Sequence, residues 1–253
     1  MSLVIYYHEL ADDDSPLCVP PSLFSQHLEV LAEEGAQVLT AGELLDALDS
    51  GTVPPRAVVL TFDDAFAAAV AEARPRLAEA AMRATFFCVA GHLGGLNDWA
   101  TQPPAVARRP LAGPEELGLL AAEGHEIGAH GWSHAPLDGP ADLEREVRAA
   151  RDRLAEVVGS EIQTFAYPYG AAPTAEARAV IEKTYRAAFG TSIGRIAADS
   201  PRWNLPRVDA HYLRDVRLLR RVVHGSFDSY LGVRRLGSRA RRALRKDYVP
   251  NPA

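Results

Sequence analysis

The stretch VVLTFDD, residues 58–64, joins a run of apolar and β-branched residues to two adjacent carboxylates. Such a run is typical of a strand buried on both faces of a parallel sheet. We therefore predict a strand over residues 57–62 that delivers Asp63 and Asp64 to its carboxyl end. In barrel-like α/β folds, chemistry gathers at the carboxyl ends of the strands. The two aspartates are therefore the first candidate site residues.

Working outward from this stretch, short apolar runs alternate with helical patterns, which predicts repeated βα units. Further strands are expected at residues 3–7, 84–90, 126–129, 164–167, 187–189 and 205–208. Helices are expected at 22–34, 65–81, 114–123, 143–158 and 174–183, and another is expected to begin after the Thr40–Glu43 capping box. Ser22 is the expected N-cap of the first helix, and Pro75 is expected to interrupt the helix at 65–81. Residues 91–113 form a long Gly- and Pro-rich stretch without periodicity, a feature usually linked to function. The alternation favours an α/β barrel.

The amino-acid composition limits the classes of protein to which the chain can belong. The chain has 253 residues, of which 47% are hydrophobic and 24% charged, and this excludes disorder, collagen-like repeats and a coiled coil. No apolar run is long enough for a membrane-spanning helix, and the first residues lack the pattern of an export signal. We therefore expect a cytoplasmic protein. Its two cysteines, Cys18 and Cys88, match no metal-binding cluster, and we assign them no chemistry.

Charge is distributed unevenly along the chain. The net charge is −6, but residues 214–253 hold 11 basic and 3 acidic groups (+8), which leaves 16 basic and 30 acidic groups (−14) before them. We divide the chain into a catalytic domain at 1–228 and a basic tail at 229–253. The tail favours contact with a phosphate-bearing substrate or the anionic inner face of a membrane, and a solvated basic helix is the alternative. We expect no nucleic-acid partner.

A second polar motif, HGWSH at residues 130–134, follows the strand predicted at 126–129. Two histidines four positions apart on a helical turn face the same side, so both imidazoles can reach one metal ion. A carboxylate of the aspartate pair would complete a three-ligand site with open positions, as catalytic zinc requires. Alone, the aspartates could cap a helix and the histidines could be structural. Together, at neighbouring strand ends, they favour a metal site.

Three motifs in order resemble those of a known family: TFDD at 61–64, HGWSH at 130–134 and FAYPYG at 165–170. They are similar to the first three motifs of the polysaccharide deacetylases, the NodB-homology or carbohydrate esterase 4 family. The resemblance extends over roughly residues 3–209 and is closest to permuted members with an N-terminal catalytic histidine, such as poly-N-acetylglucosamine deacetylases. It implies a distorted (β/α)7-type barrel and metal-dependent removal of an N-acetyl group from an amino sugar.

The resemblance also implies roles for individual residues. Asp64, His130 and His134 would bind the metal, and Asp63 would be the general base that takes a proton from metal-bound water. The backbone N–H of Tyr169 would help to hold the oxyanion. The metal is expected to be zinc, with cobalt, nickel or iron as alternatives that suit the same ligands.

Two departures from the family pattern raise further expectations. The third motif usually carries an arginine that orients the base, but this chain has Ala166 there, and Arg207 is our candidate to supply the guanidinium. An ordinary surface arginine is the alternative for Arg207. For the general acid that protonates the leaving amine, we favour His8, at the end of the first predicted strand, over His224 in the basic segment.

Substrate contacts are expected from side chains near the site. Asn97, Asp98 and Trp99 lie in the long loop, and Trp132 lies between the two histidines; aromatic rings stack on sugars and polar neighbours hold hydroxyls. A cytoplasmic enzyme would act on a small, nucleotide-linked or lipid-linked amino sugar. Two alternatives stay open: hydrolysis of another C–N amide bond, as by a deformylase or a ureide-cleaving enzyme, and an inactive carbohydrate-binding module.

Overall fold

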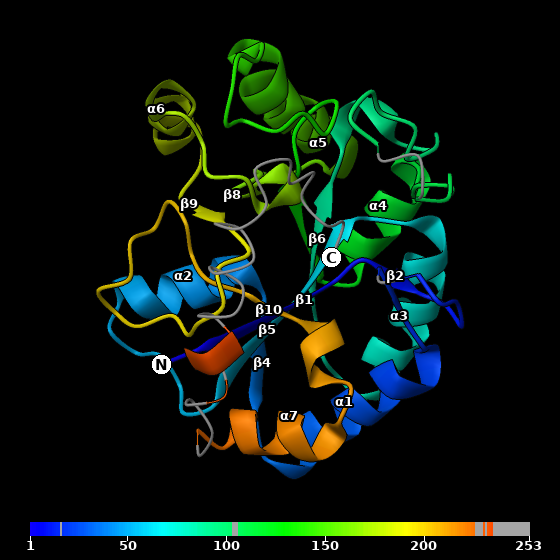
Figure 1. The fold of residues 1–253 in the computed structure, drawn as a ribbon, viewed down its shortest axis with the longest axis vertical. Coiled ribbons are helices and arrows are strands. Elements are labelled where there is room, and N and C mark those ends of the chain that lie inside the picture. Colours follow the sequence, from blue (N-terminus) through cyan, green and yellow to red (C-terminus); the bar gives the residue numbers. More distant parts are fainter. Residues whose placement is uncertain (16, 103–105, 226–229, 231, 235–253) are drawn as a thin grey trace.

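The computed structural model describes residues 1–15, 17–102, 106–225, 230 and 232–234 of the chain. Its centre is a parallel sheet in the order β10-β1-β5-β6-β7-β8-β9, with β4 also paired to β5 (Figure 1). The strands are β1 (Leu3–Tyr7), β4 (Gln37–Leu39), β5 (Ala57–Asp64), β6 (Thr85–Cys88), β7 (Glu126–Ala129), β8 (Thr164–Ala166), β9 (Ala187–Phe189) and β10 (Val208–Asp209). A separate two-stranded sheet pairs β2 (Glu9–Leu10) with β3 (Cys18–Val19).

The sheet curls until its two edges approach each other. Phe189 in β9 bridges to Leu205, a few residues before β10, and Gly190 N donates to the Leu205 carbonyl at 2.9 Å. The chain then enters β10, which pairs with β1 through Ile5 and Val208. The strands therefore form a distorted parallel barrel, which confirms the predicted fold class.

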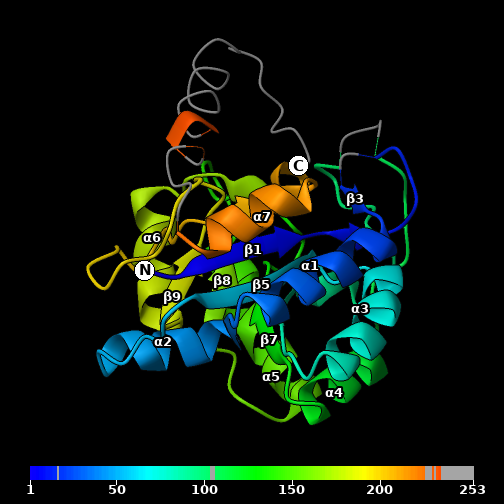
Figure 2. The ribbon, with the colours of Figure 1, turned by 90° about the horizontal axis from the view of Figure 1, so that it is seen from below.

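Helices surround this sheet (Figures 1 and 2). They are α1 (Pro21–Glu33), α2 (Ala41–Asp49), α3 (Ala67–Glu79), α4 (Pro114–Ala122), α5 (Ala150–Val158), α6 (Ala175–Thr184) and α7 (Val216–Val223). A π-helix, η2 (Glu144–Ala149), leads into α5, and short 3₁₀ turns occur at η1 (Ala90–His92), η3 (Pro168–Gly170) and η4 (Ala210–Leu213). Near the bottom of Figure 1, α7 lies against α1, where Arg220 contacts Glu34 at 2.8 Å.

Local sequence signals explain several helix ends. Thr40 and Glu43 form the predicted capping box at the start of α2, and Gly159 ends α5 in the left-handed region at φ 68°. Two expectations are wrong. The N-cap of α1 is Pro20 rather than Ser22, with the helix beginning one residue earlier. Pro75 lies inside α3 without ending it.

The core divides between the two faces of the sheet. Leu3, Ile5 and Tyr7 of β1 belong to the large apolar cluster that includes residues of α1, α3, α4 and α5. Val4, on the opposite face, belongs to a second cluster with Val59, Phe87 and residues of α2. Because side chains alternate along a strand, the face of β5 that carries Val59 also carries Asp63. The general-base candidate therefore projects from the α2-covered face of the sheet.

The predicted basic tail at 229–253 lies almost entirely outside the described residues. Tyr230 and residues 232–234 are helical, and the remaining basic positions of the tail are not described. Among the helices of the described segments, none has both the length and the apolar character needed to cross a membrane.

Candidate active site

The Asp63 carboxylate is held by a buried arginine at the carboxyl end of β5. Arg207 Nη1 donates to Asp63 Oδ1 at 2.7 Å, and Nη2 donates to Oδ2 at 2.8 Å. The Arg207 side chain is completely buried; its Nε donates to the Gly190 carbonyl and its guanidinium lies 4.7 Å from the Tyr6 ring centre. This two-bond arrangement fixes the orientation of the carboxylate. The structure thus places Arg207 against Asp63, as expected of a replacement for the arginine absent at Ala166.

Asp64 points toward the two histidines of the second motif. Its Oδ1 lies 3.3 Å from His134 Nε2 and 3.6 Å from His130 Nε2. One potential ligand atom from each of the three residues lies within 4.8 Å of the others, and all three residues are buried. The expected metal-ligand residues therefore form one cluster. Asp64 has a φ of 65°, so the backbone turns sharply there and the neighbouring Asp63 side chain faces elsewhere.

The two histidines are not on a helical turn, which corrects the expectation from their spacing. Residues 130–134 form an irregular turn in which Gly131 has a φ of 82° and His134 a φ of 58°. The buried Glu146 of η2 holds this turn: it accepts hydrogen bonds from the backbone N–H groups of Trp132 and Ser133, each at 3.0 Å, and from the Ser133 hydroxyl at 2.5 Å. A carboxylate from a π-helix therefore shapes the turn that brings the imidazoles together.

The orientation of His130 is fixed by a single backbone contact. Its Nδ1 lies 2.8 Å from the Ala166 carbonyl, which can only accept a hydrogen bond. Nδ1 therefore carries the proton, and the lone pair of Nε2 faces Asp64. Such a contact is typical of a metal-binding histidine. His134 is flanked by rings instead, with Trp99 at 4.1 Å and Tyr169 at 4.5 Å between ring centres.

His8 lies on the Asp63 side of the cluster. It follows β1 and contacts the Tyr6 ring at 5.6 Å between ring centres. Burial lowers the pKa of His8, while the charges of Asp63 and Asp209 act in the opposite direction. His224, the other candidate acid, lies at the end of α7, where its Nδ1 is 2.9 Å from Glu34. Of the two histidines, only His8 lines the pocket that contains Asp63 and Asp64.

The ionisation of the two aspartates differs. Burial alone would raise the pKa of Asp63, but Arg207, His130 and His8 bring it below its usual value. The pKa of Asp64 is raised well above its usual value by burial and by the charge of Asp63. Burial also lowers the pKa of both His130 and His134, so their imidazoles are neutral at neutral pH. Asp63 is thus prepared to act as a base, whereas Asp64 requires a nearby cation to stay ionised.

The donor set fits a divalent metal ion. Asp64 Oδ1 is buried and has no hydrogen-bond partner within the described residues. It faces two neutral imidazoles, and a carboxylate with two imidazoles is a common ligand set for zinc and related ions. A cation at this point would offset the cost of burying the Asp64 charge.

The motif that contains Tyr169 forms a tight turn at the same end of the barrel. Tyr169 and Gly170 both have a φ of 59°. A Cβ atom at Gly170 would lie 2.0 Å from Thr191 Oγ1, so this position requires glycine for space as well as for conformation. The Tyr169 hydroxyl donates to the Thr101 carbonyl at 3.0 Å, which links this turn to the long loop.

Of the four expected substrate-contact residues, two line the pocket and two do not. Asn97 and Trp99 line the pocket, but the Asn97 amide is already bonded to the backbone of Arg109 and Ala107. Asp98 and Trp132 are not among the residues that line it; Asp98 is partly exposed beside His92. The pocket is lined by His8, Leu17, Asp63, Asp64, Phe66, Asn97, Trp99, Gln102, His130, His134 and Tyr169, with a cavity of about 30 Å³.

The fold and the cluster define a class: a distorted parallel barrel with an Asp-His-His cluster and a paired carboxylate at the carboxyl ends of its strands. The sequence profile of the polysaccharide deacetylase family matches residues 50–188. The chain therefore belongs to the polysaccharide deacetylase family. The matched segment contains Asp63, Asp64 and both histidines, while His8 and Arg207 lie outside it.

Relatives and solved structures agree with this assignment. YxkH of Bacillus subtilis, a protein assigned to the polysaccharide deacetylases, is 24% identical over 208 residues, 81% of this chain and 70% of that protein. The poly-β-1,6-N-acetyl-D-glucosamine N-deacetylase of Staphylococcus aureus is 25% identical over 171 residues, which cover 66% of this chain and 58% of that protein. The structure of IcaB from Ammonifex degensii superposes with a TM-score of 0.72 at 21% identity, over 87% of this chain and 96% of that chain. The last similarity shows the fold alone.

Sequence reasoning missed two carboxylates of this region, Asp209 and Glu146. Asp209 lies in β10 opposite Tyr6 of β1, and its charge acts on His8. Glu146 belongs to no recognisable motif and lies within the segment 143–158, which was predicted only to be a helix. The one available signal for Asp209 was its position directly after a predicted strand, as for Asp63.

Proposed function

We propose that this protein is a metal-dependent hydrolase that removes N-acetyl groups from an amino sugar. The observation that carries the proposal is the pairing of two arrangements in one pocket: a buried Asp64-His130-His134 cluster and an Asp63 carboxylate fixed by Arg207. The first is suited to holding a metal ion and the second to removing a proton. Membership of the polysaccharide deacetylase family supplies the acetylated sugar as the substrate class.

Asp63 acts as the base in this proposal. Its lowered pKa keeps it ionised at neutral pH, and Arg207 holds both carboxylate oxygens so that the base does not rotate away from the attacking water. His8 donates a proton to the amine that leaves. Burial lowers the pKa of His8, and the neighbouring charges of Asp63 and Asp209 offset part of this shift toward the protonated imidazole that the role requires.

Asp64, His130 and His134 would hold the metal ion, with zinc as the proposed species and cobalt, nickel or iron as alternatives. A bound divalent ion would polarise the acetyl carbonyl and lower the pKa of a water molecule toward about 7. The backbone N–H of Tyr169 would donate to the oxygen that becomes negatively charged. Tyr169 has a left-handed conformation, and Gly170 makes this turn possible.

A small, nucleotide-linked or lipid-linked precursor is the proposed substrate type. The inactive-module alternative was motivated by the missing arginine at Ala166. That argument for an inactive module no longer holds, because Arg207 provides a guanidinium to Asp63 from another part of the chain.

The test is acetate release by metal-reconstituted protein. The substrates are free, nucleotide-linked and lipid-phosphate-linked N-acetyl amino sugars, together with β-1,6-linked N-acetylglucosamine oligomers. We expect release from at least one substrate, loss of release with chelator, and loss in Asp63→Asn while zinc binding is retained. Metal-loaded protein that releases no acetate from any substrate would contradict the proposal. Release of formate or ammonia from matched amides would then identify a different C–N hydrolase.

A further inference from the structure

Tyr6 of β1 lies below the proposed catalytic groups, on the face of the sheet that carries Asp63. Its neighbours in the sheet are Thr61 of β5, two residues before Asp63, and Asp209 of β10. Because side chains alternate along a strand, Tyr6 shares this face with Val4 of the second apolar cluster. Tyr6 is buried, and it has no part in the reaction proposed above. Its contacts indicate a supporting role.

The Tyr6 ring contacts two residues of the proposed proton transfers. The Arg207 guanidinium, which holds the Asp63 carboxylate, lies 4.7 Å from the ring centre. The face of a tyrosine ring attracts such a cation. The His8 ring packs nearly perpendicular to the Tyr6 ring, at 76° and with 5.6 Å between ring centres. One aromatic ring therefore supports both the arginine that orients the base and the imidazole proposed as the acid.

The Tyr6 hydroxyl makes a separate contact, with the Asp209 carboxylate. It donates a hydrogen bond to this carboxylate, which also accepts from His211 N at 2.8 Å. Burial raises the pKa of Tyr6 well above its usual value, so the hydroxyl keeps its proton and remains a donor at neutral pH. Asp209 in turn acts on His8 through its negative charge. The hydroxyl therefore fixes a group that acts on the proposed acid.

We propose that Tyr6 is a positioning residue for both proton transfers of the reaction. Its ring holds Arg207 against Asp63. Its hydroxyl holds the Asp209 carboxylate, whose charge acts on His8. This inference rests on the proposed N-deacetylase function. Base and acid act at different places, on the attacking water and on the leaving amine, and each must stay within hydrogen-bond reach of its partner. A single buried side chain below them serves both.

Two substitutions separate the ring from the hydroxyl. Tyr6→Phe keeps the ring and removes the hydroxyl, and it should lower kcat by roughly 3- to 10-fold, the effect of one hydrogen bond. Tyr6→Leu also removes the ring, and kcat should fall by about 100-fold because the base is displaced. In both variants KM and zinc affinity should change little, since Tyr6 is not among the residues that line the pocket.

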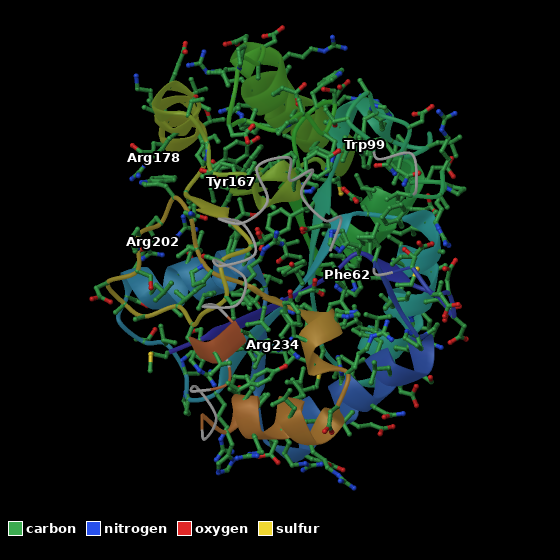
Figure 3. All side chains as sticks on the ribbon, in the orientation of Figure 1. Phe62, Trp99, Tyr167, Arg178, Arg202 and Arg234 are labelled. Atoms are coloured by element: carbon green, nitrogen blue, oxygen red, sulfur yellow. The ribbon has the colours of Figure 1, made fainter. Side chains whose placement is uncertain are left out.

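Tyr7→Phe is the matched control. Tyr7 is the next residue of β1 and points to the opposite face, where its ring stacks on Phe62 with 5.2 Å between ring centres. Figure 3 labels Phe62. The Tyr7 hydroxyl is bonded to His27, so this substitution also removes one buried tyrosine hydroxyl from the strand. We expect it to lower the thermal unfolding temperature while kcat stays at the wild-type value.

Steady-state acetate release measures kcat and KM, and competition with a chromophoric chelator measures zinc affinity. A double-mutant cycle of Tyr6→Phe with Asp209→Asn tests the route of the hydroxyl: the two effects on kcat should not be additive, because the hydroxyl acts through Asp209. An unchanged kcat in folded Tyr6→Phe, an equal loss in Tyr7→Phe, or additive effects in the cycle would overturn this inference and leave the proposed function intact. Absence of acetate release by metal-loaded wild-type protein from every substrate would overturn both.

Discussion

Arg207 is a residue whose position depends on distant parts of the chain. It reaches Asp63 from the other end of the sequence, and its guanidinium is completely buried between the Tyr6 and Phe87 rings. Two parallel hydrogen bonds hold the carboxylate, which a lysine cannot reproduce because it offers one point charge. The geometry of the base therefore depends on the shape of the side chain as well as on its charge.

Substitutions of Arg207 should separate the effect of its side-chain shape on activity from the effect of its charge. Arg207→Lys should lower kcat/KM by about 10- to 100-fold through misplacement of the base, while the acidic limb of the pH profile stays near its wild-type position. Arg207→Gln removes the charge that lowers the pKa of Asp63, so that limb should move to higher pH. The measurement is kcat/KM from pH 4.5 to 8.5 with zinc binding as control. Full activity in Arg207→Lys would refute the orienting role.

Glu146 acts on the candidate metal site through the backbone of the histidine turn. Glu146→Leu leaves the N–H groups of Trp132 and Ser133 without acceptors, and we expect zinc affinity to fall by about 10- to 100-fold. Glu146→Gln keeps one oxygen for these N–H groups, and the Ser133 hydroxyl can accept from its amide, so affinity should stay within a few-fold. Competition with a chromophoric chelator measures both. Equal losses in the two variants would point to general destabilisation instead.

At the scale of single residues, much of the candidate site was predictable. Asp63, Asp64, His130 and His134 belong to contiguous motifs, and the structure brings them into one pocket. Contacts between residues far apart in the sequence leave no such pattern. The spacing of the two histidines suggested a helical turn, because no nearby residue indicates that Glu146 holds a different turn there. The roles of all these residues remain predictions until activity is measured.

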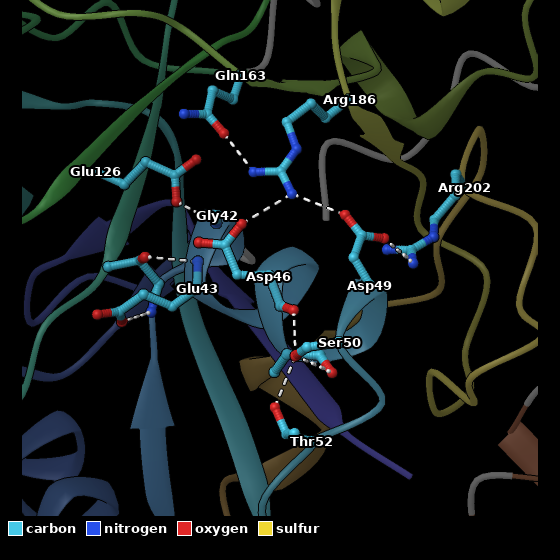
Figure 4. Close-up of polar contacts among 12 residues, drawn as sticks. Gly42, Glu43, Asp46, Asp49, Ser50, Thr52, Glu126, Gln163, Arg186 and Arg202 are labelled. Atoms are coloured by element: carbon cyan, nitrogen blue, oxygen red, sulfur yellow. Dashed lines mark hydrogen bonds and ion pairs between the residues drawn. The ribbon is translucent and has the colours of Figure 1, made fainter.

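At the scale of elements, α2 is joined to the sheet by one half-buried carboxylate. Glu126 at the start of β7 accepts from Gly42 N at 2.6 Å, from Thr85 Oγ1 at 3.1 Å and from Thr164 Oγ1 at 2.7 Å. Figure 4 shows this contact with Gly42 and the surface network in which Arg186 contacts Asp49 at 2.9 Å. The first set is half-buried and the second is exposed, so their contributions to stability should differ.

This difference gives a direct prediction. Glu126→Ala removes the acceptor of three donors and should lower the free energy of unfolding by roughly 2–4 kcal/mol. Asp49→Ala removes exposed ion pairs with Arg186 and Arg202 and should cost below about 1 kcal/mol. Urea unfolding of both variants provides the comparison. A loss in Asp49→Ala as large as that in Glu126→Ala would contradict this ranking.

Element prediction from sequence succeeded where the apolar pattern was strong. The strands at 3–7, 126–129 and 187–189 were predicted at their observed bounds. The strand β4 was missed because it has only three residues and is half-exposed, so it carries no buried apolar run. The strand predicted at 205–208 begins later, at Val208, because Pro206 lacks the N–H that regular pairing requires.

At the scale of the whole molecule, His27 links three separate parts of the fold. The Tyr7 hydroxyl lies 2.8 Å from His27 Nδ1, and His27 Nε2 lies 3.0 Å from the Leu213 carbonyl. The carbonyl can only accept, so Nε2 carries the proton and Nδ1 accepts from Tyr7. This arrangement uses the neutral imidazole. Burial lowers the pKa of His27 to about 4, although the bond to Leu213 opposes the shift.

The pH dependence of stability follows from this shift. Below about pH 6.5 the unfolded chain protonates this histidine while the folded chain does not, so the contribution to stability is lost as pH falls from about 6.5 to 4. Other buried histidines add to the same slope. We expect His27→Gln to have a lower free energy of unfolding at pH 7.5. Its free energy of unfolding should also fall less steeply between pH 6.5 and 4, by up to the contribution of one proton, about 1.4 kcal/mol per pH unit. Urea unfolding at pH 4.5 to 7.5 measures the slopes, and identical slopes would refute the assignment.

The pairing of β1 with β10 has a consequence for synthesis of the chain. Ile5 is synthesised well before Val208, its neighbour on one side, because the two residues lie far apart in the sequence. Until then β1 has an open edge, His8 lacks Asp209, and Asp63 lacks Arg207. A nascent or truncated chain that ends before β10 therefore contains the candidate metal ligands Asp64, His130 and His134 but lacks the arginine that orients Asp63. The candidate active site is therefore complete only after the last strand has closed the barrel.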